Sequence, residues 1–418
     1  MTDAASTAPG AQVSSTTLRP GELVEAVDAL RDSTGSVLVR GAGTKQDWAG
    51  AVRDPDLVLD TTDMNQVITH NPADMTVSVQ AGIPLRSLQE HVGSQGQWVA
   101  LDPASAAAGA TVGGLLAAGD SGPSRQRYGG LRDLVIGVTV VLVDGSVGRS
   151  GGHVIKNVAG YDLAKLMHGS LGSLALIGEV VLRLHPIPPA RRTVRAPASA
   201  PDATAAVLAL AAGPLEPSRI AWSGDTNGEG TLVVGVEGSV EAARNAADRV
   251  VAALGEMGLK AQVLSDTEAH DAWSQHEAQV TGSETETVLA LNGLPSELAT
   301  VADVVRRSGA ASDLATGLVS WAGVGMHVAR FAAGEPRQLA RAVQQVRAYA
   351  GRAGCSTMLR RRPQELDAHL DVMGAPPSSV GVLRAIKSRF DPDDRLAPGR
   401  FAGWYDPSSS LAGRRGNL

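Results

Sequence analysis

Cysteine is almost missing from this sequence, since Cys355 is the single one among 418 residues. A disulfide within the chain, or an iron–sulfur cluster held by its own cysteines, is therefore excluded, and we expect Cys355 to be a small buried residue. Aromatic residues are also few, at 3%, and the net charge is −6. Because no basic stripe carries interleaved aromatics, the sequence argues against nucleic acid as a partner.

Long apolar runs are missing too. No stretch reaches the length that spans a membrane, and the chain does not open with a basic segment followed by an apolar one. We therefore expect a cytoplasmic protein, at most peripheral to the inner face of the membrane through partner proteins. Glycine, by contrast, is abundant, with 48 residues that are denser before residue 180. This indicates many turns, or close approach of the backbone to a ligand.

A first glycine-rich loop follows a short apolar strand at 37–40 and runs from Gly41 to Lys45. Such a loop exposes backbone N–H groups that can surround a phosphate. It is not a dinucleotide fingerprint of the Rossmann type, because Gln46 stands where the third glycine belongs, and it lacks the Gly-Lys-Ser/Thr of a P-loop. The pattern predicts a phosphate-binding loop of another kind, with a plain hairpin turn as the alternative.

Two further stretches combine small residues with regular elements. The run from Gly109 to Gly122 is rich in Gly, Ala, Ser and Thr, and suits a long flat ligand lying along the main chain. Between a helix ending near Met167 and a strand beginning near Leu174, residues 169–173 are mostly Gly and Ser, which indicates a close approach to the backbone. A tight helix-to-strand turn is the alternative for this second stretch.

Together these motifs carry a resemblance to a known family. In chain order they are RGAGT at 40–44, Asp102-Pro103, ATVGG at 110–114, RYG at 127–129, the Asp144-Gly145 hairpin and KNVAGYDL at 156–163. This ordered set resembles the FAD-binding domain of the vanillyl-alcohol-oxidase (PCMH) type. The KNVAGYDL form is most similar to the FAD-binding subunits of bacterial glycolate oxidases. The resemblance covers residues 18–188 and, less fully, the C-terminal segment.

The resemblance implies a set of residues that bind FAD. The first loop would hold the pyrophosphate, the second run would line the flavin ring and ribityl chain, and the residues after 170 would lie on the adenine side. Residues 40–50 hold no His or Cys, so we expect FAD to be bound non-covalently. The predicted cofactor-binding residues are Arg40, Gly41, Ala42, Gly43, Thr44, Lys45, Asp102, Pro103, Ala110, Thr111, Gly113, Gly114, Gly119, Gly172, Ser173 and Ile177.

The chain length predicts two or three domains, and we expect an α+β fold. Strands and helices alternate after residue 200, which is typical of the cap domain in this family. The expected organisation is a disordered tail at 1–17, a two-part PCMH-type FAD-binding domain at 18–189, a linker at 190–200, an α+β cap domain at 201–380 and a C-terminal segment at 381–418 that returns to pack on the FAD-binding domain.

Catalytic groups are harder to find. Related catalytic subunits carry a His-Val-Gly-Asp-Gly-Asn segment that holds a metal, whereas this chain has Gly-Val-Gly-Met-His-Val at 323–328. We interpret His327 as a histidine within a strand, expect no metal site and assign no catalytic residue. Ala397 stands where the family usually has Asn, and we expect a polar contact to flavin or substrate to be missing there.

The resemblance implies a function for the whole chain. It would be the FAD-binding subunit of a glycolate (2-hydroxy acid) oxidase or dehydrogenase complex, taking part in electron transfer from substrate to a downstream acceptor and not active alone. Its partners would be a larger flavin-containing catalytic subunit and an iron–sulfur subunit, with a small 2-hydroxy acid as substrate of the complex. Two alternatives stay open: a self-sufficient FAD-dependent oxidase or dehydrogenase, and a non-enzymatic ligand-binding protein with a decayed flavin site.

Overall fold

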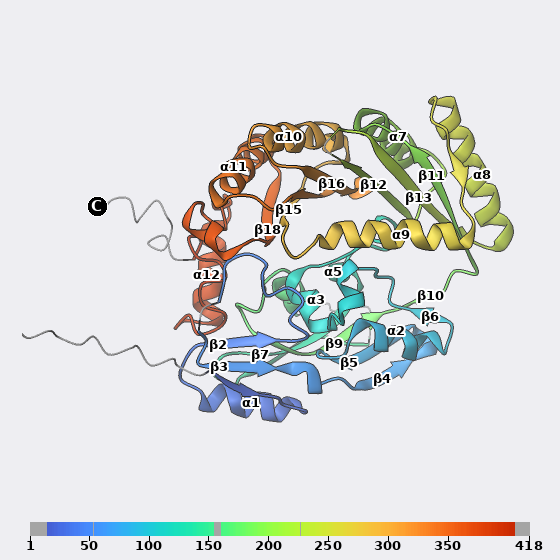
Figure 1. Cartoon of the computed structure of the whole chain (residues 1–418). Helices are drawn as coiled ribbons and strands as arrows, with labels where there is room; N and C mark the ends of the chain where they lie inside the picture. Colours follow the sequence, from blue (N-terminus) through green and yellow to red (C-terminus); the bar gives the residue numbers. More distant parts are fainter. Residues whose placement is uncertain (1–14, 53, 154–159, 226, 406–418) are drawn as a thin grey trace, which may run out of the picture.

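The computed structural model describes residues 15–52, 54–153, 160–225 and 227–405. These residues form two bodies that lie one above the other in Figure 1, each a mixture of helices and sheet. The α+β fold expected from the sequence is confirmed. Within these ranges, none of the helices combines the length and the apolar character that crossing a membrane requires.

The N-terminal domain, the lower body in Figure 1, contains two main sheets. A parallel sheet has the strand order β1-β3-β2, and an antiparallel sheet has the order β4-β5-β9-β7-β8. Their strands are β1 (Thr16–Leu18), β2 (Val37–Arg40), β3 (Leu57–Asp60), β4 (Val67–Asn71), β5 (Thr76–Gln80), β7 (Val135–Val141), β8 (Val147–Gly151) and β9 (Leu176–Arg183), with β6 (Gln97–Trp98) pairing β10 (His185–Pro186) beside them.

Short helices connect these strands, because the chain between them is rich in Gly and Pro. The longer ones bury one apolar stripe, as α1 does through Ala26, Val27 and Leu30. The helices of this domain are α1 (Leu23–Asp32), α2 (Leu85–Gly93), α3 (Val112–Ala118), α4 (Arg125–Tyr128), α5 (Leu131–Leu134), α6 (Leu163–Met167) and the 3-10 turns η1 (Thr61–Asp63), η2 (Pro72–Asp74) and η3 (Ala104–Ala108).

The second domain, which we call the cap domain, is built on one antiparallel sheet with the order β14-β11-β13-β12-β16-β17-β15-β18. Its strands are β11 (Ala190–Pro197), β12 (Arg219–Asp225), β13 (Gly230–Gly238), β14 (Gln262–Val263), β15 (Thr287–Asn292), β16 (Thr316–Trp321), β17 (Met326–Phe331) and β18 (Ser356–Arg361). Its helices are α7 (Ala200–Ala212), α8 (Val240–Glu256), α9 (Asp266–Thr281), α10 (Leu298–Ala310), α11 (Pro336–Ala353) and the 3-10 turns η4 (Pro295–Glu297), η5 (Ala322–Val324) and η6 (Gln364–Ala368).

Different helices pack on the two faces of the cap sheet. Helices α7, α8, α10 and α11 cover the outer face and enclose the largest apolar cluster of the protein, which includes Trp222, Phe331 and Leu359. Helix α9 lies between the inner face and the N-terminal domain, and its Trp273 and Val280 pack on the sheet (Figure 1). The inner face is therefore largely separated from the N-terminal domain by one helix.

Two expectations about the ends of the domains are wrong. Residues 1–14 of the expected tail lie outside the described part, but Thr16 and Thr17 belong to β1, which pairs with β3. The expected linker at 190–200 is strand β11, placed between β13 and β14. Its alternation of inward Val194 and Ala196 with Arg195 has the period of a strand. Arg191 and Arg195 therefore mark the opposite face of the sheet and do not indicate a solvated connection.

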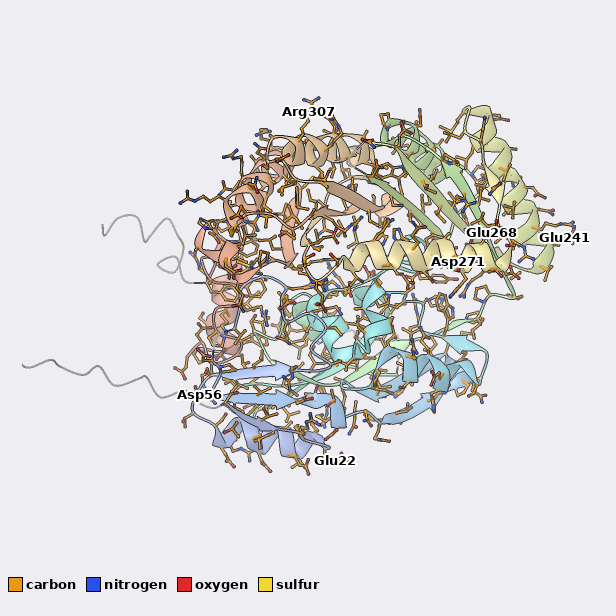
Figure 2. The ribbon with its side chains drawn as sticks, viewed as in Figure 1. Glu22, Asp56, Glu241, Glu268, Asp271 and Arg307 are labelled. Carbon is orange, nitrogen blue, oxygen red and sulfur yellow. The ribbon has the colours of Figure 1, made fainter. Side chains whose placement is uncertain are left out.

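Helix α9, strand β12 and strand β4 were not predicted. The start of α9 is set by a capping box, in which the Glu268 N–H donates to Ser265 Oγ at 3.3 Å and the Ser265 N–H donates to Glu268 Oε2 at 2.9 Å. Figure 2 shows Glu268 and Asp271 on the N-terminal half of this helix. The sequence signal was missed because the helix has no continuous apolar stripe.

The C-terminal segment returns to the N-terminal domain, as expected. After helix α12 (Val380–Phe390), Leu396 forms a parallel bridge with Val37 of β2. Lys387 is buried, and its Nζ donates to the carbonyl oxygens of Ser173 and Leu396 at 3.0 and 3.1 Å and to Asp391 Oδ2 at 2.6 Å. One ammonium group therefore fixes α12, the strand-like segment after it and the start of the chain leading into β9.

Replacing Lys387 by Met should destabilise the fold by about 3 kcal/mol or more, because Asp391 would stay buried without its cation. Urea unfolding would measure the loss, and Lys260→Met, at an exposed lysine, is the matched control. Equal free energies of unfolding for the two variants would contradict the structural role of Lys387.

Candidate functional site

A cavity lies where the two main sheets of the N-terminal domain meet. Ten of the sixteen predicted cofactor-binding residues line it: Gly41, Ala42, Gly43, Thr44, Lys45, Thr111, Gly113, Gly114, Gly172 and Ile177. The rest of the lining includes Gln46, Thr61, Ala81, Leu171 and Arg400. Three stretches that are far apart in the sequence are thus brought together. We call this space the first cavity.

The first glycine loop gives this cavity a row of hydrogen-bond donors. Within the part of the chain that the structure describes, the amides of Ala42, Gly43, Thr44 and Lys45 donate to no protein acceptor. The loop closes with the Gln46 N–H donating to the Gly43 carbonyl at 3.3 Å, and Gly43 has φ of +75°, which favours glycine. Successive free amides of this kind suit a phosphate oxygen.

The backbone of Lys45 lines the cavity, whereas its ammonium group binds Asp120 and Ser105. Its Nζ lies 3.2 Å from Asp120 Oδ2 and donates to Ser105 Oγ at 2.7 Å. Burial lowers the pKa of the Lys45 ammonium, and the neighbouring Asp120 opposes that shift. Because the ammonium is buried and already paired, its side chain stabilises the loop and does not supply a free cation.

Arg400 holds the far end of the same loop. Its Nη1 donates to the carbonyl oxygens of Gln46, Trp48 and Gly50 at 2.7, 2.9 and 3.0 Å, and its Nη2 donates to Gln46 Oε1 at 2.7 Å. The side chain is buried, and burial lowers the pKa of Arg400 to about 10. Its Nε is buried without a protein acceptor among the described residues. The loop conformation therefore depends on the C-terminal segment.

Two glycines that line the cavity allow close packing of protein on protein. A Cβ on Gly113 of the second run would lie 2.8 Å from the Cβ of Ala81, and one on Gly41 of the first loop would lie 2.3 Å from Thr111 Oγ1. Thr111 caps α3, accepting from the Gly114 N–H at 3.2 Å. The expectation that Gly113 serves mainly ligand approach is thus not supported by its surroundings.

Gly172 has the opposite character. Its φ is +76°, and a Cβ there would meet only the carbonyl oxygen of Val39 at 3.9 Å, so the space before it is open cavity. The preceding Leu171 also lines the cavity and has φ of +51°, a strained conformation for a leucine. Its N–H donates to the Ala117 carbonyl at 2.8 Å, which holds the strained turn against α3.

Six predicted residues lie outside the lining of the first cavity. Arg40 donates to Asp60 Oδ2 at 2.9 Å, Gly119 ends α3 against the ring of His168, and the Ser173 hydroxyl donates to the Ser170 carbonyl at 2.7 Å. The remaining three are Asp102, Pro103 and Ala110. Their predicted contact with FAD stays a prediction, and their positions show structural roles.

Asp102 belongs to the contact between the domains. Its carboxylate accepts from the Ser124 hydroxyl at 2.6 Å and from the Ser124 N–H at 3.0 Å. Burial raises the pKa of Asp102, and Arg219 of the cap domain opposes the shift. Nearby, the Tyr128 hydroxyl donates to Glu237 of β13, and burial together with that carboxylate raises the pKa of Tyr128 to about 12. Helix α4 and its neighbours thus fasten the cap domain.

The candidate catalytic features do not meet at the first cavity. His327 is buried in β17, as interpreted from the sequence, with Nδ1 2.9 Å from Ser320 Oγ, and burial lowers its pKa to about 4. Ala397 is buried outside the lining with φ of +46°, a conformation that Asn adopts more readily than Ala. Lys156 and Asn157 lie outside the described residues, and Tyr161 is 90% exposed.

The cysteine and the possible metal ligands are the remaining groups of interest. Cys355 is only half-buried, because it follows the C-terminal glycine of α11 at the surface. Among the described residues, no group of three or more His, Cys, Asp or Glu is placed to hold a metal ion.

Comparison with known proteins identifies the class of the N-terminal domain. Residues 19–151 match the family described as FAD binding domain. A solved structure of alkyldihydroxyacetonephosphate synthase has the same fold, with a TM-score of 0.69 and 16% identity over 91% of this chain and 76% of that one. Residues 19–151 are therefore similar to FAD-binding domains, and the likeness to the solved structure shows the fold.

Curated relatives include glycolate oxidase subunits as well as D-lactate and D-2-hydroxyglutarate dehydrogenases. Glycolate oxidase subunit GlcE of Escherichia coli (strain K12) is 32% identical over 223 residues, covering 53% of this chain and 62% of GlcE. Glycolate oxidase subunit GlcD of Bacillus subtilis (strain 168) is 35% identical over 160 residues, covering 38% of this chain and 34% of GlcD. The chain thus spans less than two thirds of the length of these relatives.

Substitutions at Gly172 and Gly113 should have opposite effects. Asparagine tolerates positive φ, so Gly172→Asn should leave the melting temperature of the flavin-free protein almost unchanged. Its side chain would enter the open cavity, so the purified variant should contain less flavin than the wild type. Gly113→Ala should destabilise the flavin-free protein by about 1–3 kcal/mol through overpacking against Ala81. Flavin absorbance and thermal unfolding of both variants would check this, and equal losses in both measurements would contradict it.

The buried His327 predicts a loss of stability in acid. Its pKa is about 4 in the folded chain and about 6.5 when unfolded, so between these values the unfolded state binds a proton that the folded state does not. The free energy of unfolding should fall by about 2 kcal/mol from pH 7 to pH 5 through this residue. His327→Gln should remove that share of the pH dependence, whereas His91→Gln, at an exposed position, should not. An unchanged slope in His327→Gln would refute this assignment.

Proposed function

We propose that this chain is the FAD-binding subunit of a complex that oxidises a small 2-hydroxy acid, with glycolate as the first candidate. The observation that carries the proposal is the row of four free amides in the first cavity, on a domain of the FAD-binding type. Relatives named as glycolate oxidase subunits support the substrate class. FAD, when bound, supplies the group that accepts electrons from the substrate or from another flavin and passes them on.

The residues of the first cavity fit this cofactor. The amides of residues 42–45 would hold the pyrophosphate, and the open space before Gly172 would admit the elongated molecule. Arg400 keeps the loop in the shape that presents those amides. Because residues 40–50 contain neither His nor Cys, non-covalent binding is part of the proposal.

Two features support a role as one subunit of several. Oxidation of a hydroxy acid needs a base for the hydroxyl or α-proton and a cation for the carboxylate. In the described lining of the first cavity the ionisable side chains are Lys45 and Arg400, and both are engaged with protein groups. Helix α9 also covers the cap-sheet face that points towards the N-terminal domain.

The partners in this proposal are a larger flavin-containing subunit that carries the substrate site and an iron–sulfur subunit that accepts electrons. A single cysteine in the chain means that a cysteine-ligated cluster would have to belong to another chain. A cytoplasmic location, peripheral to the inner face of the membrane through those partners, is also part of the proposal.

The test begins with the purified chain alone. It should be yellow, and acid precipitation should release its flavin. Glycolate- and D-lactate-dependent dye reduction should be absent with the lone chain and appear when the two partner subunits are added. Adding the Gly172→Asn chain in place of the wild type should restore little activity, because that variant carries little flavin.

Other outcomes would select the alternatives. Fast turnover by the lone chain, unchanged by the partners, would establish a self-sufficient oxidase. A colourless chain that takes up no added FAD would indicate a decayed flavin site. Flavin that stays with the acid-precipitated protein would contradict non-covalent binding.

A further inference from the structure

A second cavity, of about 320 Å³, lies wholly within the cap domain. It is bounded on one side by α9 and on the other by the inner face of the sheet, near the ends of β11, β12, β13, β16 and β17. It shares no lining residue with the first cavity and takes none from the N-terminal domain. Its volume is within the range of small-molecule sites. We call it the cap cavity.

The helix wall of the cap cavity is unusually polar. A helix that covers a sheet normally turns an apolar stripe towards it. Ala272, Gln275, His276 and Gln279 are spaced so that they share one face of α9, and all four line the cavity. A face with two amides and an imidazole gains little from packing on a sheet, so its composition is better explained by polar ligand contacts.

The sheet wall supplies cations and hydroxyls. Arg195 of β11 and Arg330 of β17 both line the cavity, together with Ser223 and Thr231 of the neighbouring strands. Glu286 accepts from Arg330 Nη1 at 3.1 Å and takes up that charge. Arg195 forms no salt bridge and no hydrogen bond with the described residues, although its charge acts on the exposed Glu268. Its guanidinium N–H groups therefore remain available to the cavity.

Two buried polar atoms in the lining side chains lack a protein partner. Within the described residues, neither Arg330 Nε nor Gln279 Oε1 has one, although both atoms are shielded from solvent. Leaving such an atom without a partner is unfavourable. His276 is fixed beside them, because Trp321 Nε1 donates to its Nε2 at 2.9 Å and so leaves the proton on Nδ1. The cavity thus has unused donors and an unused acceptor.

We propose that the cap cavity binds a small monocarboxylate that carries a hydroxyl or oxo oxygen beside the carboxylate. Arg195 would hold the carboxylate, since its guanidinium makes no hydrogen bond with the described residues, whereas Arg330 is bound to Glu286. The amides and hydroxyls of α9 and the sheet would bind the second oxygen. A dianion such as phosphate is disfavoured, because Glu286 already neutralises Arg330 and the exposed Asp225 and Glu229 lie at the cavity.

The ligand class coincides with the substrate or product class of the proposed function, but the site is separate from the flavin-binding cavity. Binding here would let the subunit respond to the hydroxy acid, or to the oxo acid formed from it, without carrying out the oxidation. The site is therefore testable in flavin-free protein, whatever the outcome for the flavin and its partners.

Isothermal titration calorimetry on the flavin-free full chain tests the proposal with glycolate, glyoxylate and D-lactate, and with acetate and inorganic phosphate as comparison ligands. We expect binding of at least one of the first three, and weaker binding of acetate and phosphate. Arg195→Gln should weaken that binding by about tenfold or more, the effect of losing a charged hydrogen bond. Arg192→Gln, the same change three positions earlier on the opposite face of β11 and outside the cavity, should leave it unchanged.

A second pair of variants tests the cavity itself. Ala272→Phe should fill it and abolish binding, whereas Ala278→Phe, on the exposed side of α9, should not. Thermal unfolding of each variant confirms that it is folded, and the Arg195 pair remains decisive if Ala272→Phe does not fold. No binding of any of the three acids, tighter binding of phosphate, or equal losses within either pair would overturn the proposal. Loss of flavin with retained acid binding would count only against the proposed function.

Discussion

The guanidinium of Arg400 makes the contacts on which the first cavity most depends. It binds the carbonyl oxygens of Gln46, Trp48 and Gly50, which follow the first glycine loop and lie about 350 positions earlier in the chain. Burying a cation costs several kcal/mol unless it is hydrogen-bonded, and here four bonds at 2.7–3.0 Å offset that cost. These bonds fix the chain directly after the loop that carries the free amides. The chain therefore cannot complete this site before its C-terminal segment has returned.

The same logic explains the position of Lys45. An unpaired ammonium in the loop would be expensive to bury. Asp120 and Ser105 offset that cost by binding Nζ. The loop is then left with its backbone amides to offer to an anion, and its shape decides where they point. Gly43 and Gly172, both with positive φ, and the strained Leu171 set that shape.

The sequence predicted most of the regular elements and the central part of the cavity, because strand alternation and glycine clusters are local signals. The helix α8 and its buried Ala243, Ala247, Val250 and Leu254 were found for that reason. Arg400 and Leu171 were not placed in the site, since their roles depend on contacts with distant segments. Asp102 is predicted to bind FAD, but in the structure it is buried next to the cap domain and accepts hydrogen bonds from Ser124. The three arginines of strand β11 suggest an exposed linker, and they obscure the alternation of every second residue that marks a strand.

Helix α9 connects these observations to function. Its cavity-facing side is polar, and its Trp273, His276 and Val280 are buried against the sheet, so it is neither a surface helix nor an ordinary core helix. A cap sheet open towards the flavin could present a substrate to it, whereas this sheet presents its inner face mainly to α9. The polar groups that would otherwise meet a substrate over the flavin are instead gathered between sheet and helix. Under the two proposals made above, that arrangement would separate electron transfer, in the N-terminal domain, from recognition of a small acid, in the cap domain.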